Sequence, residues 1–79
     1  MRLNIKYFAL MREQANVAQE SVETAASTPA ELFAQLAQKH GFTLSRDQLK
    51  VAVNSEFGTW TQALKAGDSV VFIPPVAGG

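Results

Sequence analysis

The sequence predicts an α+β fold in which a mixed sheet of four or five strands carries one main helix across one face. Alternating apolar residues predict a strand at residues 2–10, and the most strand-like run of the chain predicts another at residues 69–73. A capped amphipathic segment predicts a helix at residues 29–40. The 79 residues suffice for one domain. Two terminal strands in so short a chain can lie side by side and parallel beneath the helix, which is the arrangement of a β-grasp, a ubiquitin-like roll.

The N-terminal part of the chain predicts two strands with a polar break between them. Over residues 2–10 the odd-numbered positions are apolar and share one face, and the even-numbered positions, which include Phe8, fall on the other. Residues 11–16 form the break, with at most one short helical turn. Residues 20–24, around Val22, predict a short charged strand that can form a hairpin with the first.

The helix at residues 29–40 has the strongest local signals in the sequence. Thr28 supplies a capping hydroxyl, proline stands at the first helical position, and Glu31 can close a capping box. Gly41 ends the helix because it adopts the left-handed conformation without steric cost. The apolar stripe consists of Leu32, Phe33, Leu36 and Ala37.

The C-terminal part predicts the rest of the sheet. Residues 49–54 read as a third strand, residues 55–59 as a turn and residues 59–62, around Trp60, as a short edge strand. A tight turn at residues 64–68 leads into the strand at residues 69–73. The two prolines that follow end this strand, since proline cannot donate to a sheet ladder.

The composition excludes several classes of protein. The chain has no cysteine and one histidine, so we expect no disulfide, no cysteine nucleophile and no metal site. Seven Lys and Arg residues balance seven Asp and Glu residues, which argues against binding to nucleic acid or to a membrane. The sequence shows no secretion signal and no membrane span, so we expect a cytoplasmic protein. Phosphate-binding glycine motifs are also missing. These absences favour a carrier or a subunit over an enzyme that is catalytic alone.

The chain ends in two glycines, and we predict a β-grasp domain at residues 1–75 followed by a flexible tail at residues 76–79. Without a β-carbon, the last residues can enter a narrow channel, and the terminal carboxyl is an unhindered acyl group. The double proline directs the tail away from the sheet. An inert terminus is also compatible with two small terminal residues. The candidate site residues at this end of the chain are Pro75 and the tail residues Val76, Ala77, Gly78 and Gly79.

Three segments resemble the small subunit of molybdopterin synthase, a ubiquitin-like sulfur carrier. Residues 67–79 (GDSVVFIPPVAGG) are similar to that family's GD-x-V and PPV-x-GG ending. Residues 8–13 (FALMRE) resemble its FA-x-x-RE segment, and residues 51–54 (VAVN) resemble its AVN strand. The resemblance therefore covers nearly the whole chain.

The resemblance implies a chemistry for Gly79. An adenylyltransferase similar to ubiquitin-activating proteins would use ATP to adenylate Gly79, and a sulfurtransferase would supply the sulfur that converts it to a thiocarboxylate. The large subunit of the synthase would then transfer this sulfur to cyclic pyranopterin monophosphate, in molybdenum cofactor biosynthesis. The chain itself would bind no cofactor and would be a non-catalytic, sulfur-donating subunit. The family further suggests a heterotetramer with two small subunits at opposite ends of a large-subunit dimer.

The resemblance and the strand alternation together predict a surface for binding partners. If Val70 and Phe72 point into the core, Ile73 points to the other face of the sheet, beside Phe8. Exposed apolar residues next to a reactive tail form a natural docking patch. For Trp60 we expect a packing role, and for His40 no role beyond a place at the helix end. The partner-binding residues expected are Phe8, Arg12, Phe57, Ile73 and Val76.

Two other hypotheses for the function of the chain stay open. Within the same fold, the chain would carry sulfur for another pathway, such as thiazole or cysteine synthesis, or would act as a ubiquitin-like modifier. From a different class, it would be a β-grasp interaction module whose terminus is inert. The Pro-Pro-Val sequence before the glycines and the segment at residues 8–13 favour the synthase subunit.

Overall fold

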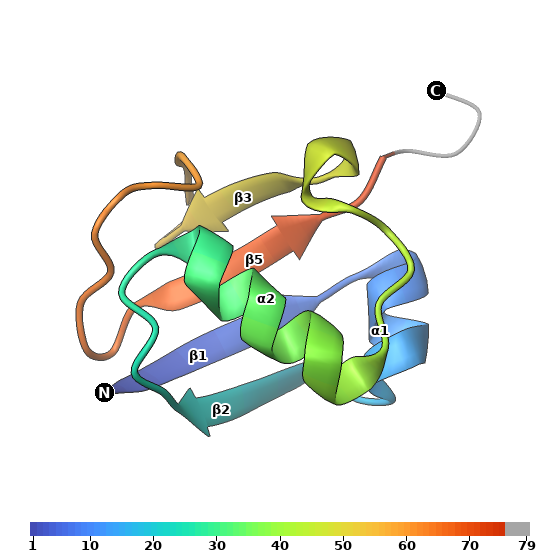
Figure 1. Cartoon of the computed structure of the whole chain (residues 1–79), viewed down its shortest axis with the longest axis horizontal. Helices are drawn as coiled ribbons and strands as arrows, with labels where there is room; N and C mark the ends of the chain where they lie inside the picture. The colour runs from blue at the N-terminus through green and yellow to red at the C-terminus, as the bar shows by residue number, and fades with distance from the viewer. Residues whose placement is uncertain (76–79) are drawn as a thin grey trace.

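The computed structural model describes residues 1–75, which form a five-stranded mixed sheet with one long helix across one face (Figure 1). The strand order is β2-β1-β5-β3-β4, with β1 and β5 parallel and the other neighbours antiparallel. This confirms the predicted β-grasp roll with parallel terminal strands. The elements are β1 (Arg2–Tyr7), α1 (Ala9–Ala15), β2 (Gln19–Glu23), α2 (Pro29–His40), a 3₁₀ turn (Arg46–Gln48), β3 (Lys50–Val53), β4 (Glu56–Phe57) and β5 (Ser69–Ile73).

The main helix, α2, has the bounds that its capping signals predict. The hydroxyl of Thr28 accepts a hydrogen bond from the Glu31 backbone N–H at 3.2 Å, and Gly41 ends the helix with φ at 71°. In the predicted capping box, the Glu31 carboxylate would accept a hydrogen bond from the backbone N–H of Thr28, and this part is wrong. The carboxylate instead accepts from the backbone N–H and the hydroxyl of Ser27, the residue before the cap, at 2.8 and 2.7 Å.

The first strand is shorter than predicted, because a second helix follows it. β1 ends at Tyr7, and α1 occupies seven residues that the alternation assigned to a strand end and a polar break. The apolar side of α1 consists of Met11 and Ala15, which lie four residues apart and are buried in the core. Asn16 ends the helix in the left-handed conformation, with φ at 62°. The residues of α1 are good helix formers, but seven residues are too few for a stable isolated helix, so the two buried side chains supply the stabilisation that it needs.

The region after β3 also differs from the prediction. Asn54 and Ser55 both have positive φ, at 53° and 72°, and make a tight turn into β4, which pairs with β3. The predicted edge strand at residues 59–62 is wrong, since the chain turns there. Trp60 stacks on Phe72 with ring centroids 5.8 Å apart, which confirms its packing role.

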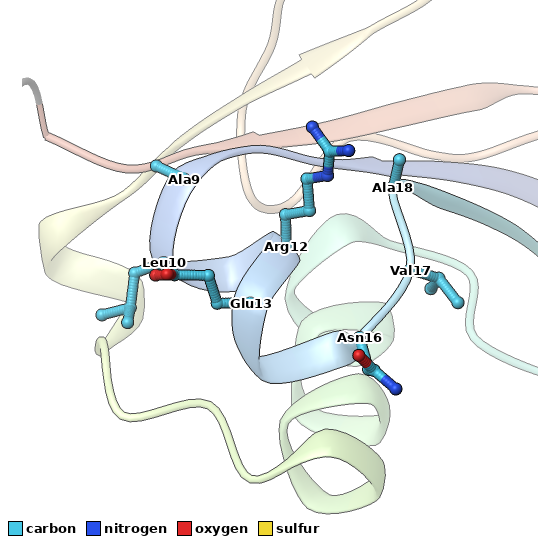
Figure 2. Close-up of a pocket in the computed structure, with 7 residues that line it drawn as sticks. All are labelled: Ala9, Leu10, Arg12, Glu13, Asn16, Val17 and Ala18. Atoms are coloured by element: carbon cyan, nitrogen blue, oxygen red, sulfur yellow. The ribbon is translucent and has the colours of Figure 1, made fainter.

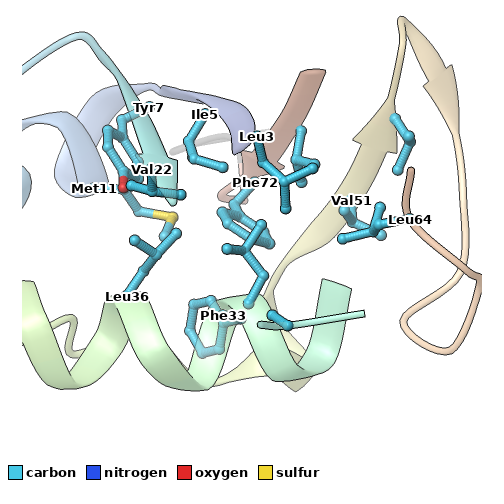
Figure 3. Packing of buried hydrophobic residues seen from close by; sticks show 14 of the residues in the cluster. Leu3, Ile5, Tyr7, Met11, Val22, Phe33, Leu36, Val51, Leu64 and Phe72 are labelled. Carbon is cyan, nitrogen blue, oxygen red and sulfur yellow. The ribbon is translucent and has the colours of Figure 1, made fainter. Parts of the chain in front are cut away.

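The core lies between one face of the sheet and α2, as Figure 3 shows. Val70 and Phe72 on β5 are fully buried, which confirms the predicted orientation of this strand. Phe33 on α2 packs against Phe72 at 5.5 Å between ring centroids. Other fully buried apolar side chains include Leu3, Ile5, Met11, Leu32, Leu36 and Val51.

Candidate functional site

The sheet face opposite α2 gathers apolar side chains from four elements. The ladders place Lys6, Val71, Ala52 and Phe57 in one row across β1, β5, β3 and β4. The next row pairs Ile73 with Lys50. We call this surface the open face and define it by Lys6, Phe8, Lys50, Ala52, Phe57, Val71 and Ile73.

Phe8 joins the open face although it lies outside β1. Its backbone is extended, with φ at −131° and ψ at 155°, so its side chain points to the side opposite the buried Tyr7. The side chain is 53% exposed, and that of Phe57 is 76% exposed. Val71 and Ile73 lie half-buried between them. Three of the predicted partner-binding residues, Phe8, Phe57 and Ile73, therefore share one surface, and their role in binding stays a prediction.

Lys50 borders the most exposed ring of this surface. Its Nζ lies 5.9 Å from the centroid of the Phe57 ring, within the range of a cation–π interaction. Because β4 has only two residues, this contact helps to orient a side chain that has little other support. The sequence did not indicate Lys50, since the pairing of β3 with β4 depends on the turn at Asn54.

Arg12 lies on α1, one helical turn after Phe8. Its backbone N–H donates to the Phe8 carbonyl at 3.4 Å, so Arg12 lies close to the edge of the open face. It is exposed and makes no ion pair within residues 1–75. An open hollow of about 700 Å³ surrounds it (Figure 2) and includes the exposed side chains of Leu10 and Val17. The sequence assigned Leu10 to the end of a strand and predicted no role for its side chain.

Two prolines separate the end of β5 from the predicted tail. Pro74 and Pro75 border a smaller hollow of about 300 Å³, together with Ile73, Lys50 and Gln48. Pro75 therefore leaves the sheet at the edge of the open face. Val76, Ala77, Gly78 and Gly79 lie outside the described residues, so the tail and its boundary with the domain stay predictions.

Two of the segments used for the family resemblance contribute to stability. The Asn54 amide donates to Asp68 at 2.9 Å, and its oxygen accepts from the Ser69 backbone N–H at 2.9 Å. The Asp68 carboxylate also accepts from the Lys65 backbone N–H at 2.8 Å. The hydrogen bonds from Asn54 and then Lys65 lower the pKa of Asp68. This network ties the end of β3 to the start of β5.

A second polar cluster lies on the α2 side of the sheet, where the sequence predicted no role for His40. The Glu20 carboxylate on β2 lies 2.6 Å from His40 Nε2 and 3.0 Å from Lys39 Nζ, and it accepts a hydrogen bond from the Tyr7 hydroxyl at 2.5 Å. Burial alone would raise the pKa of Glu20, but the hydrogen bonds from Tyr7, Lys39 and His40 outweigh it and lower the pKa to about 2. Burial, and then Glu20, raise the pKa of Tyr7 far above its usual range.

Neither cluster is suited to holding a metal ion. Within residues 1–75, no three or more His, Asp or Glu side chains are placed to share one ion. No helix in the same residues has the length and apolar character needed to cross a membrane. The chemistry available at the open face is therefore that of apolar contact with positive charge at its border.

A family model and two relatives from different organisms match nearly the whole chain. The model of the ThiS family matches residues 5–79. The molybdopterin synthase sulfur carrier subunit of Haemophilus influenzae is 35% identical over 98% of this chain and 99% of that protein. The protein of the same name from Drosophila melanogaster is 34% identical over 100% of this chain and 92% of that protein.

Solved structures support the fold. SAMP1 from Haloferax volcanii superposes with a TM-score of 0.84, at 27% identity over the whole of both chains. Molybdopterin-converting factor from Helicobacter pylori, solved as a complex of its subunits 1 and 2, matches with a TM-score of 0.70 at 25% identity, again over the whole of both chains. Residues 1–75 thus share the ubiquitin-like β-grasp arrangement of these solved structures.

Proposed function

Because the chain belongs to the ThiS family, we propose that it is the sulfur-carrier subunit of a molybdopterin synthase and carries sulfur on Gly79. The observation that supports this most is the 35% identity, over nearly the full length of both proteins, to a relative with that name. The open face and the double proline beside it suit such a role, since a carrier must dock on a partner and deliver its C-terminus.

The proposed chemistry takes place at the terminal carboxyl. A carboxylate is a poor acyl donor, because oxide is a poor leaving group. Attack of the Gly79 carboxylate on the α-phosphate of ATP, in the activating enzyme, releases pyrophosphate and leaves an acyl adenylate. The persulfide of a sulfurtransferase then attacks the acyl carbon and displaces AMP, which gives an acyl disulfide. A thiol cleaves the S–S bond of this intermediate, and the products are the Gly79 thiocarboxylate and a new disulfide. The large subunit would direct this sulfur to cyclic pyranopterin monophosphate.

In this proposal the small subunit binds and positions, while its partners catalyse. The open face offers apolar contact and two lysines, but no pairing of a nucleophile with a base near Pro75 among the described residues. Docking through this face would fix the start of the tail against the partner, and the partner's site would then receive Gly79 at high effective concentration. The complex of subunits 1 and 2 in the H. pylori protein supports a large-subunit partner.

Reconstitution tests the proposal. The purified chain, incubated with ATP, an adenylyltransferase of the ubiquitin-activating type and a sulfur donor, should gain the mass of one oxygen-to-sulfur exchange. The change should be confined to the C-terminal peptide. A variant that lacks Gly79 is the matched control and should gain nothing. Sulfur acquired by that variant would place the reactive group elsewhere and refute the proposal.

One structural match favours a second candidate. SAMP1 of H. volcanii, the small archaeal modifier protein 1, has the higher TM-score of the two matches described above. In a modifier, the amine of a lysine on another protein would attack the Gly79 acyl adenylate, form an isopeptide bond and release AMP. Conjugates that carry the Gly79 remnant on lysine would support this candidate. A thiocarboxylate without conjugates would support the carrier.

A further inference from the structure

Positive charge is concentrated on the open face, although the whole chain has no net charge. Lys6 and Lys50 lie directly opposite Val71 and Ile73 in the two ladders of β5. Both lysines are exposed, and neither makes an ion pair within residues 1–75. Arg12 adds a third cation near this face, since its backbone N–H donates to the Phe8 carbonyl at 3.4 Å.

The carboxylates of the strands are placed elsewhere. Glu20 and Glu56 stand opposite Ile5 and Val53, so both point to the α2 side of the sheet. Glu23 shares the face of Lys6 but is paired with Arg2 at 3.5 Å and with the N-terminus. Glu13 follows Arg12 on α1, and Figure 2 shows the two side chains directed away from each other. The open face therefore presents an apolar centre with unpaired cations at its border.

We propose that the surface of the synthase large subunit that receives the open face is an apolar patch bordered by carboxylates, and that Lys6 and Lys50 select for it. The inference rests on the proposed function, since it assumes that docking precedes delivery of the tail. Apolar contacts at the centre supply affinity once water is excluded. The solvated cations at the border accelerate encounter with an acidic surface and repel a basic one.

Lys50 also orients Phe57, in addition to its proposed charge effect on partner choice. Its ammonium lies over the Phe57 ring, so it also positions the most exposed anchor of the open face. Replacement by glutamine removes both the charge and the cation–π contact, whereas Lys50→Arg retains both. If Lys50→Arg associates as fast as wild type while Lys50→Gln is slower, the effect comes from the charge and from the position of Phe57. A simple loss of packing would affect both variants.

The experiment measures association of the chain with the purified molybdopterin synthase large subunit of the same organism. At an ionic strength of about 0.01 M, the Lys6→Gln/Lys50→Gln double variant should associate about tenfold more slowly than wild type. At about 1 M, where the Debye length is about 3 Å, the two rates should converge. Lys65→Gln removes an exposed lysine from the turn before β5 and should change nothing. Equal rates and equal salt dependence for wild type and the double variant would overturn the inference.

Anionic lipid is the competing occupant of a cationic apolar face. Vesicles of phosphatidylserine and phosphatidylcholine, tested at the lower ionic strength, should bind wild type and double variant equally weakly. Vesicle binding that the double variant loses, with the rate for the large subunit unchanged, would overturn the inference in favour of a membrane. The gain of sulfur at Gly79 is a separate readout. If it occurs while the lysines have no effect, only this inference fails; if it does not occur, the proposed function fails.

Discussion

Ile73 lies opposite Lys50 in the antiparallel ladder between β5 and β3, while Phe72, the preceding residue, is fully buried against α2. One strand thus contributes alternately to the core and to the open face. Because of this alternation, Ile73 on the open face lies only two residues before Pro75. The stability of the domain and the proposed binding of a partner can therefore be tested separately on neighbouring residues.

Ile73→Asp should weaken binding of the large subunit by at least about tenfold and leave the domain folded. The side chain is half-buried on a face that no helix covers, so a carboxylate there stays hydrated in the free chain and is desolvated only in the complex. Titration calorimetry and circular dichroism check the two expectations. Phe72→Asp is the matched control and should unfold the domain, because it buries an unpaired charge. Unfolding of Ile73→Asp would show that the two faces of β5 are assigned wrongly.

The sequence predicts the parts of the fold that depend on local signals. Capping residues and an apolar stripe locate α2 to the residue, and a run of β-branched and aromatic residues locates β5. α1 was missed because only Met11 and Ala15 mark its buried side, and alternation can continue into such a short helix. β4 was missed because it depends on positive φ at two non-glycine residues, Asn54 and Ser55.

The residues of the candidate site also include some that the sequence predicted and some that it did not. Phe8, Phe57 and Ile73 were predicted through the family resemblance and lie together on the open face. The lysines were not predicted, because their positions follow from the register of three strands. No short motif brings together the Glu20 cluster either, since β2 and the end of α2 meet only through the tertiary fold.

Asn54→Ala should lower the free energy of unfolding by about 2 kcal/mol, since it removes two hydrogen bonds and places alanine at positive φ. Asn54→Gly tolerates this conformation and loses only the hydrogen bonds, so it should cost about half as much. Urea titration measures both values. Sulfur loading of either variant at a temperature where it is folded should match wild type. Reduced loading of a folded variant would mean that Asn54 acts in partner recognition.

Glu20→Gln should lower the free energy of unfolding by about 2 kcal/mol, because a neutral amide accepts weaker hydrogen bonds than a carboxylate from Tyr7, Lys39 and His40. Urea titration at neutral pH tests this, with Glu23→Gln as the control on the exposed side of the same strand. Large-subunit binding should be unchanged, since the cluster lies on the α2 side of the sheet. A loss of stability equal to that of the control would contradict the stabilising role.

The lowered pKa of Glu20 also predicts how the free energy of unfolding depends on pH. The pKa of Glu20 is about 2 in the folded chain, against an ordinary value of 4.5, so the unfolded chain binds a proton first. The stabilisation is complete above about pH 4.5 and is lost as the pH falls towards 2. Urea titrations across this range should show a smaller loss of stability for Glu20→Gln than for wild type. Parallel curves would show that Glu20 does not cause the acid sensitivity.

The central claim is that Gly79 is the sulfur-bearing residue, and the mass of the C-terminal peptide from the native cell tests it most directly. Digestion of the protein purified from cells that make molybdopterin should yield this peptide in two forms, which differ by one oxygen-to-sulfur exchange. The heavier form should increase when the large subunit is absent, because nothing then removes the sulfur. A peptide found only as the carboxylate, in cells with and without the large subunit, would contradict the account.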